Sequence, residues 1–351
     1  MTQDFHQAPM VIFWEVTRAC ALACRHCRAR AQPKRHPQEL TTQEGFGLLD
    51  QMAEFGNRPI VVLTGGDPLM RRDISDFIGY GIDKGLTVSL SPSATTLVRP
   101  QTLRWLKEAG LAHISFSLDG AKPETHDAFR GVPGAFQRTQ ECIADATEAG
   151  LSVRINTTVT RHSLPELEDL AVMVGQSAVG LWDLFFLVPT GRAQGEDMIS
   201  PQEHEQVFNW VADLSEASSF AIRTTLGQPY RRVLLQRLAA NGQGPSNPAG
   251  QKMPTTNDGR GVCFISHVGR VQPSGFLPLP AGNIRTKPLT DIYRHAALFK
   301  KLRDPGLLRG KCGVCPFNEI CGGCRARAYA TSGDYLESDP SCVFRPDGTE
   351  A

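Results

Sequence analysis

The sequence predicts an α/β fold: a partial (β/α)6 barrel of the TIM type, followed by a small Cys-rich module. The first observation is a repeated order of short apolar runs and amphipathic stretches between about residues 10 and 190. The second is the distribution of the ten cysteines, eight of which fall within residues 20–27 and 312–342. A repeated strand–helix order implies parallel strands joined by right-handed crossovers.

The predicted barrel is built from six strands and the helices that follow them. We expect strands at residues 11–16, 60–63, 87–90, 113–118, 152–159 and 182–188. We expect helices at residues 42–55, 72–84, 100–108, 136–149 and 165–177, and a more polar one at 201–216. Gly110 and Gly150 each follow the end of a predicted helix, where glycine favours a left-handed stop. Six units fit an open, partial barrel better than the closed barrel of eight units.

The chain divides into four predicted segments. A tail at residues 1–9 precedes the barrel at 10–225. A linker and loop region is expected at 226–262, because its second half is rich in Gly, Pro, Asn and Ser. The Cys-rich module at 263–351 has little helical periodicity outside a stretch at 289–302.

The composition is that of an ordinary globular protein, with 351 residues, 41% of them hydrophobic and 21% charged. The formal net charge of +1 gives no electrostatic argument for nucleic acid or an anionic membrane. We see no signal segment and no apolar run of membrane-spanning length, so a cytoplasmic location is expected. Clustered cysteines in such a chain indicate metal ligation rather than disulfides.

Three cysteines with C-x3-C-x2-C spacing, Cys20, Cys24 and Cys27, follow the first predicted strand. Three thiolates on a short loop can bind three irons of a cubane cluster and leave the fourth iron open. In parallel barrels, reactive groups collect at the carboxyl ends of the strands, where this loop lies. On this motif alone, a structural zinc loop or a set of reduced thiols stays open.

The segment from residue 10 to about 190 resembles the radical S-adenosylmethionine (SAM) superfamily. After the second strand, the run Gly65-Gly66-Asp67-Pro68 is similar to the family's glycine-glycine-acid-proline motif. In that family the backbone of the motif receives the amino group of SAM, and glycines permit close approach. His26 stands where many members have an aromatic residue next to the adenine, and its planar ring is expected to serve there.

The same resemblance implies further cofactor contacts from the ends of the fourth, fifth and sixth strands. These residues are Ser117, Asp119, Asn156, Thr158 and Val188. The family's reduced 4Fe-4S cluster cleaves SAM into methionine and a 5′-deoxyadenosyl radical, which abstracts hydrogen from the substrate. The protein supplies ligation, orientation and a dry cavity. A reductant such as flavodoxin or ferredoxin is the expected partner, and the sequence assigns no catalytic acid or base.

The C-terminal cysteines have the spacing C-x2-C-x5-C-x2-C-x17-C. This resembles the SPASM and twitch extensions of the superfamily, which carry auxiliary iron–sulfur clusters. Cys263 and Gly275 fit the beginning of the SPASM pattern, but Pro280 stands where its second Cys is expected. The resemblance therefore implies one auxiliary 4Fe-4S cluster, with the ligands Cys312, Cys315, Cys321 and Cys342.

The main alternative for this module is a four-thiolate zinc site. It would use Cys324 in place of Cys342, although the five-residue gap between its Cys pairs is short for a zinc ribbon. Cys142 lies in a predicted helix and is expected to be a small buried hydrophobe. The roles of Cys263 and Cys324 stay open.

Residues 321–334 resemble the C-terminal signature of the heme-pathway members, the heme b synthase and heme d1 maturation branch. This implies a small anionic tetrapyrrole as substrate, with alteration of its propionate side chains. The first alternative is a maturase of a ribosomally made peptide. It is disfavoured because the first strand begins near residue 10 and leaves no room for an N-terminal peptide-binding domain. The second alternative is a non-catalytic iron–sulfur electron carrier, which would not need the SAM motif.

A run of basic residues lies beside the first Cys motif: Arg25, Arg28, Arg30, Lys34, Arg35 and His36. Charge runs are typical of solvated surface loops. The alternative is that some of these cations face the cavity and bind substrate carboxylates, for which the planar fork of Arg is suited.

Overall fold

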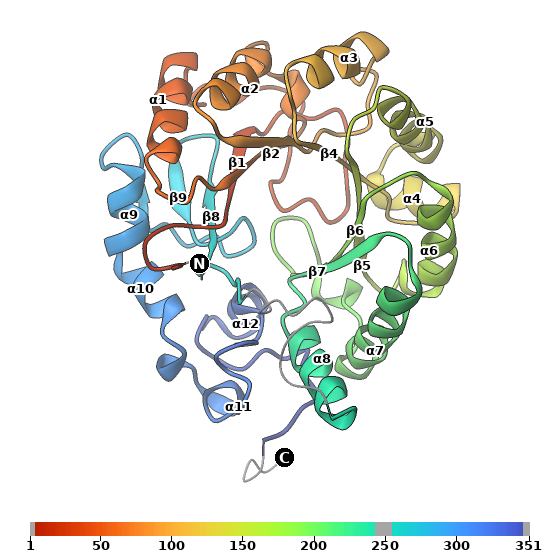
Figure 1. Ribbon diagram of the computed structural model, residues 1–351, viewed down its shortest axis with the longest axis vertical. Coiled ribbons are helices and arrows are strands. Elements are labelled where there is room, and N and C mark those ends of the chain that lie inside the picture. The colour runs from red at the N-terminus through yellow and green to blue at the C-terminus, as the bar shows by residue number, and fades with distance from the viewer. Residues whose placement is uncertain (1–3, 243–254, 347–351) are drawn as a thin grey trace.

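The parallel strands of the barrel follow one another in space in the order of the chain. The computed structural model describes residues 4–242 and 255–346. Its seven neighbouring parallel strands are β1 (Val11–Thr17), β2 (Ile60–Gly65), β3 (Thr87–Leu90), β4 (His113–Ser117), β5 (Val153–Val159), β6 (Leu181–Phe186) and β7 (Ala221–Thr225). The sheet curves but ends at β7, so the predicted partial barrel is confirmed (Figure 1).

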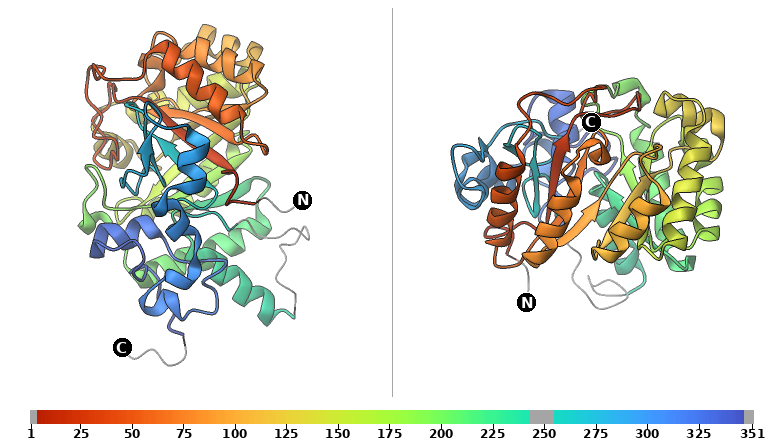
Figure 2. Two further views of the ribbon diagram at one scale, coloured as in Figure 1. Left: turned by 90° about the vertical axis from the view of Figure 1, so that its left-hand side faces the viewer. Right: turned by 90° about the horizontal axis from the view of Figure 1, so that it is seen from above.

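Helices surround the outside of these strands in chain order (Figures 1 and 2). They are α1 (Thr42–Ala53), α2 (Ile74–Asp83), α3 (Pro100–Glu108), α4 (Pro123–Arg130), α5 (Ala135–Glu148), α6 (Leu167–Gln176), α7 (Pro201–Ala217) and α8 (Pro229–Ala240). Thr41 and Glu44 form a capping box at α1, and Ser200 and Glu203 form another at α7. These boxes satisfy backbone N–H groups that a helix start leaves unpaired.

Side chains along β1 point alternately toward the surrounding helices and toward the inside of the barrel. Ile12, Trp14 and Val16 are fully buried, and the Trp14 ring lies 4.8 Å from that of Phe77 on α2. The side chain of Glu15 lies on the opposite face of the strand from those of Trp14 and Val16, and it therefore points into the barrel. A carboxylate in that position requires polar partners, and these belong to the site described below.

The C-terminal module continues the same sheet. Strand β8 (Val262–Ile265) pairs in parallel with β1, and β9 (Arg270–Gln272) and β10 (Gly282–Asn283) follow in antiparallel order. The helices of the module are α9 (Leu289–His295), α10 (Ala297–Arg303), α11 (Gly310–Gly313) and α12 (Arg325–Ser332). The guanidinium of Arg327 on α12 is fully buried and donates to the carbonyl oxygens of Phe186 and Leu226. The module is therefore bound to the carboxyl ends of the barrel strands.

Several predicted elements differ from the structure. Residues 229–240, expected within a linker, form α8, which packs on α7 with the Tyr230 and Phe208 rings 6.0 Å apart. The stretch at 289–302 forms two helices, because Ala296 has an extended backbone between them. Most of the loop predicted around residues 241–260 lies outside the described residues. The part of the expected tail that is described packs on α9, where Tyr293 Oη donates to the Phe5 carbonyl oxygen at 2.9 Å.

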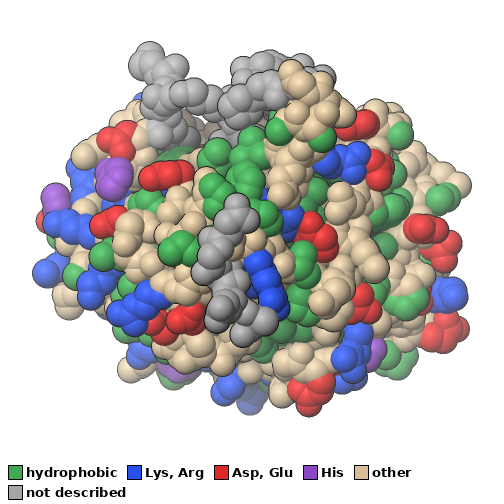
Figure 3. All heavy atoms as spheres, turned by 90° about the horizontal axis from the view of Figure 1, so that it is seen from below, with side chains coloured by type: hydrophobic (Ala, Val, Ile, Leu, Met, Phe, Trp, Pro, Cys, Tyr) green, Lys and Arg blue, Asp and Glu red, His purple; other side chains and the backbone are tan. Residues whose placement is uncertain are grey.

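On the face that carries α8 and α11, acidic and basic side chains are interspersed around hydrophobic ones (Figure 3). Within residues 4–242 and 255–346, every helix is too short or too polar to cross a membrane.

Candidate functional site

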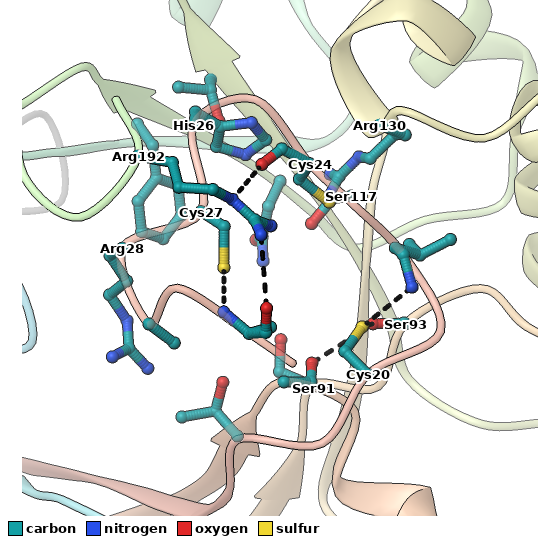
Figure 4. A pocket seen from close by; sticks show the side chains of 18 of the residues that line it. Cys20, Cys24, His26, Cys27, Arg28, Ser91, Ser93, Ser117, Arg130 and Arg192 are labelled. Carbon is teal, nitrogen blue, oxygen red and sulfur yellow. Dashed lines mark hydrogen bonds between the residues drawn. The ribbon is translucent and has the colours of Figure 1, made fainter. Parts of the chain in front are cut away.

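A cavity of about 200 Å³ opens at the carboxyl ends of the barrel strands (Figure 4). It collects most of the residues that the sequence singled out for the SAM site: Cys20, Cys24, His26, Cys27, Gly65, Gly66, Ser117, Asn156, Thr158 and Val188. Asp67, Pro68 and Asp119 do not line it. The residues come from the loop after β1, the end of β2 and the residue after it, from β4 and β5, and from just beyond β6, as the strand-end rule for parallel barrels predicts.

Each of the three cysteine sulfurs in this cavity accepts a hydrogen bond. The Leu22 and Ala31 backbone N–H groups donate to Cys20 Sγ and Cys27 Sγ, both at 3.3 Å. Arg130 Nη1 donates to Cys24 Sγ at 3.6 Å. Burial raises the pKa of Cys20, so the free thiol is the neutral form at pH 7. Donors aimed at sulfur favour the thiolate that a metal requires.

The glycine motif holds the Cys loop at very short range. A Cβ atom on Gly65 or Gly66 would overlap the carbonyl oxygens of Thr17 and Ala19. The Gly66 N–H donates to the Thr17 carbonyl oxygen at 2.8 Å, and the Asp67 N–H donates to that of Ala19 at 2.7 Å. The close approach that requires glycine here is therefore to the Cys loop itself.

Asp67 lies behind the cavity wall, where its carboxylate accepts hydrogen bonds from the protein. It is fully buried, and its carboxylate accepts from the Leu69 N–H at 3.1 Å and from Thr95 Oγ1 at 3.0 Å. Burial raises the pKa of Asp67 to about 6. The side chain thus caps the short 3₁₀ turn that begins at Pro68.

Asp119, expected from the sequence to contact the cofactor, is also buried behind the cavity wall. Its Oδ1 accepts from the Thr158 N–H at 2.6 Å, and Oδ2 is paired with Arg130. Burial would raise the pKa of Asp119, but the charge of Arg130, the two neighbouring histidines and the Thr158 N–H together lower it. The carboxylate therefore holds Arg130 in place against the sulfur of Cys24.

His26 presents a flat ring to the cavity. The ring stacks on Phe129 with centroids 4.1 Å apart and planes 4° apart. Burial lowers the pKa of His26 to about 4, so the ring is neutral at pH 7. Its Nδ1 is buried and has no hydrogen-bond partner in the described part of the chain.

Sequence reasoning missed two arginines and two serines that line the cavity. Arg130 lies at the end of α4, and Arg192 follows β6 and donates to the carbonyl oxygens of Cys24 and Ala31 at 2.9 and 3.2 Å. Ser91 and Ser93 follow β3 (Figure 4). Their position after a strand could have identified the serines, whereas neither arginine belongs to a local motif.

Most of the basic run beside Cys27 is turned away from the cavity. Arg25 pairs with Asp197 at 3.0 Å, Arg35 pairs with Glu39 at 2.6 Å, and Arg30 Nε donates to a loop carbonyl oxygen. Arg28 is the member of the run that lines the cavity. Most of this run therefore fits the interpretation as a surface loop. Arg28 alone in the run still fits the interpretation that its cations bind substrate carboxylates.

A second, smaller cavity lies in the C-terminal module. Its lining includes the four cysteines that were expected to bind an auxiliary cluster: Cys312, Cys315, Cys321 and Cys342. Cys324 does not line it. Its side chain is fully buried among apolar residues that include Val188, and its Sγ accepts the Arg327 N–H at the start of α12. Cys142 and Cys263 are fully buried in the main core.

The cysteines of the two cavities form one set of three and one set of four. Within the two described ranges, no three Cys, His, Asp or Glu side chains converge on one metal-ion position. The thiolates around a cubane each bind a different iron and so need not converge on one point. The expected SAM-cleaving cluster requires three cysteines, and three line the first cavity. The expected auxiliary cluster requires four, and four line the second cavity.

Comparison with known proteins gives a consistent result. The model of the radical SAM superfamily matches residues 14–173. An AdoMet-dependent heme synthase of Nitratidesulfovibrio vulgaris is 42% identical over 342 residues, which are 96% of this chain and 92% of that protein. One of Methanosarcina barkeri is 41% identical and covers 97% of both chains. The crystal structure of Streptococcus suis SuiB bound to S-adenosylmethionine has a TM-score of 0.74 at 16% identity, over 96% of this chain and 78% of that one.

Proposed function

Because this chain belongs to the radical SAM superfamily and matches AdoMet-dependent heme synthases over nearly its whole length, we propose that it modifies the propionate side chains of an iron tetrapyrrole. The observation that supports this proposal best is the cavity in which the three cysteines after β1 meet residues at the carboxyl ends of β2, β3, β4, β5 and β6. Enzymes of this superfamily use a 4Fe-4S cluster and SAM, and so does this chain.

Cys20, Cys24 and Cys27 are the proposed ligands of the SAM-cleaving cluster. When bound, the reduced cluster supplies the electron that cleaves SAM into methionine and a 5′-deoxyadenosyl radical. The N–H donors of Leu22, Ala31 and Arg130 favour the anionic form of the three sulfurs. The positive charge of Arg130 beside Cys24 also favours the more negative, reduced state of the cluster.

The proposed SAM site is the remainder of the same wall. Gly65 and Gly66 offer backbone groups without side chains, and His26 offers a neutral flat ring for the adenine. Polar contacts are proposed from Ser117, Asn156 and Thr158, and an apolar contact from Val188. Asp67 and Asp119 hold this wall in shape from behind rather than contacting the cofactor.

The proposed auxiliary 4Fe-4S cluster is bound by Cys312, Cys315, Cys321 and Cys342. Arg325 Nη2 donates to Cys312 Sγ at 3.7 Å, and the Gly323 N–H donates to Cys321 Sγ at 3.4 Å. Hydrogen bonds to sulfur and nearby cations are means by which proteins set a cluster potential. The burial of Cys324 in an apolar core supports this ligand set over the zinc alternative.

We propose that the electron reaches the cluster from a flavodoxin or ferredoxin. All ten cysteines are free, which suits the reducing conditions of a cytoplasm and supports that location.

A peptide substrate is the second candidate. SuiB has also been crystallised bound to its precursor peptide SuiA, but at 16% identity that likeness supports only the fold.

Anaerobic reconstitution followed by mass spectrometry tests the proposal. Iron coproporphyrin III should change mass while 5′-deoxyadenosine forms, and a variant with Cys20, Cys24 and Cys27 all changed to Ala should give neither product. Modification of a peptide with an unchanged tetrapyrrole would favour the maturase alternative. Absence of 5′-deoxyadenosine from the reconstituted wild type, with every candidate substrate, would favour an electron carrier.

A further inference from the structure

Arg28 occupies a different part of the cavity from the other two arginines. It follows Cys27 directly and its side chain lies at one edge of the pocket, whereas Arg130 and Arg192 reach the Cys loop from α4 and from the loop after β6 (Figure 4). Phe276 of the C-terminal module also lines the cavity. Arg28 is therefore placed beside the radical-generating site and next to the module that completes the cavity.

The other two arginines are already engaged by the protein. Arg130 pairs with Asp119 and donates to Cys24 Sγ. Arg192 donates to two carbonyl oxygens of the Cys loop. Both guanidinium groups hold the cluster loop. Arg192 Nη2 and Arg130 Nε have no hydrogen-bond partner in the described part of the chain, but both atoms are buried. Among these three arginines, Arg28 is therefore the one whose free donors are not buried against the Cys loop.

The guanidinium of Arg28 is held in a fixed orientation. Its Nη1 donates to Glu15 Oε2 at 2.9 Å, and the group lies over the Phe264 ring with 4.6 Å to the centroid. In the described part of the chain, this is the one hydrogen bond of the guanidinium to a protein atom. Since a guanidinium has five N–H donors, most of them remain for a ligand.

Glu15 is itself held by a partner from the C-terminal module. Its Oε1 lies 2.7 Å from Nδ1 of His267, and the residue is 4% exposed. Burial would raise the pKa of Glu15, but His267 and Arg28 together lower it, so the carboxylate is ionised at pH 7. A buried charged group of this kind adds little stability compared with apolar packing. Its use here is to orient a charged side chain at the cavity wall.

Gly275 lets the C-terminal module pack closely on Arg28. A Cβ atom at that position would lie 3.0 Å from Arg28 Nε and 3.1 Å from Cζ, tighter than ordinary packing. A larger residue there would displace the guanidinium from its place over Phe264. A planar guanidinium held in this way can bind a carboxylate through two parallel hydrogen bonds.

We propose that Arg28, oriented by Glu15 and Phe264, binds a carboxylate of the substrate and selects for propionate-bearing tetrapyrroles. This inference rests on the proposed function and adds the residue that recognises the substrate. Glu15 is a positioning residue in this scheme, because it acts on the substrate through Arg28.

The test measures binding to the full-length, reconstituted protein, without turnover. Iron coproporphyrin III and its tetramethyl ester are titrated, and the shift of the porphyrin Soret band gives the dissociation constants. The wild type should bind the acid more tightly than the ester. Arg28→Gln should weaken binding of the acid about 10- to 100-fold, the value of a charged bidentate contact, and leave the ester unchanged. Arg28→Lys should lie between the two.

Arg35→Gln is the matched control, since it removes the same charge from a partly exposed side chain that does not line the cavity. It should bind the acid as the wild type does, and the electron paramagnetic resonance spectrum of the clusters should match in all variants. Wild-type affinity for the acid in Arg28→Gln would overturn the inference and leave the proposed function standing. A wild type that binds neither porphyrin would overturn both. If Arg28→Gln does not assemble its clusters, equal wild-type affinities for acid and ester would overturn carboxylate recognition.

Discussion

Arg327 and Asp339 form an ion pair in which both side chains are completely buried, with Nη1 and Oδ2 3.4 Å apart. Arg327 also donates to carbonyl oxygens at the ends of β6 and β7. Asp339 accepts the Cys324 N–H at 2.7 Å, and its own N–H donates to Cys312 Sγ at 3.5 Å. This pair therefore connects the barrel ends, which carry the SAM site, with the proposed auxiliary cluster.

Asp339→Ala should be strongly destabilising, because it leaves a buried guanidinium without its counter-charge. We expect a loss of about 3–5 kcal/mol in the free energy of unfolding, the usual cost of breaking a buried pair. Thermal or denaturant unfolding of the apo protein measures it. Asp334→Ala, which removes the partner of the exposed Arg309, should cost no more than about 1 kcal/mol. Equal losses in both variants would mean that the buried pair has no special role.

Cys342 and Cys324 should respond oppositely to substitution by Ser. Cys342→Ser should lose or destabilise the auxiliary cluster, because an alcohol is a poor ligand for an iron–sulfur cluster. Cys324 caps α12 with its sulfur, and Ser is a favoured residue at a helix start, so Cys324→Ser should keep the cluster. Iron and sulfide analysis checks this, with a fall of about four irons per chain in the first variant. The reverse pattern would favour the zinc-type ligand set.

His204 should contribute stability that is lost in mild acid. The side chain is buried, its ring stacks on Phe186, and Nδ1 lies 2.8 Å from the Ser200 carbonyl oxygen. Burial lowers the pKa of His204 to about 4, below its ordinary value of 6.5. Between these two values the unfolded chain binds the proton more readily, so the folded state loses stability as pH falls from about 6.5 to 4.

His204→Asn keeps an N–H donor and removes this titration. The variant should therefore show a weaker decline in the free energy of unfolding across the same pH range, measured in denaturant. His6→Asn, which changes an exposed histidine, is the control and should follow the wild type. Identical slopes in all three proteins would show that His204 does not titrate in this way.

Local signals explain which parts of the fold the sequence predicted. The bounds of β3 and α3 were predicted correctly, since Pro100 marks the helix start and Gly110 follows its end. Strand β7 was missed because it is half-exposed and lacks the apolar alternation of a barrel strand. Helix α8 was missed because the Gly- and Pro-rich stretch that follows it dominated the composition of that region.

The candidate site shows the same division between local and tertiary information. Cys20, Cys24, Cys27, Gly65 and Gly66 lie in short motifs, and the structure brings them to one cavity as expected. Arg130 and Arg192 reach that cavity from α4 and from the loop after β6, more than a hundred residues away in the chain from the cysteine atoms they bind. No local pattern encodes such contacts. The position of Asp119 behind the wall likewise follows from its buried partner, which only the fold reveals.

Gly66→Ala tests whether the glycine motif serves the Cys loop as well as the cofactor. The new Cβ would overlap the backbone carbonyl group of Ala19, which cannot move without displacing the segment that carries Cys20. We expect impaired assembly of the SAM-cleaving cluster, together with retention of the auxiliary one. Iron content and the electron paramagnetic resonance signal of the reduced protein report both clusters.

Gly79→Ala is the matched control for Gly66→Ala, because its Cβ meets no atom within 4 Å and it lies inside α2. That change should stabilise the protein by about 0.5–1 kcal/mol through helix propensity and leave both clusters intact. Normal assembly in Gly66→Ala would show that the Cys loop tolerates displacement, and the need for glycine would then rest on the cofactor alone.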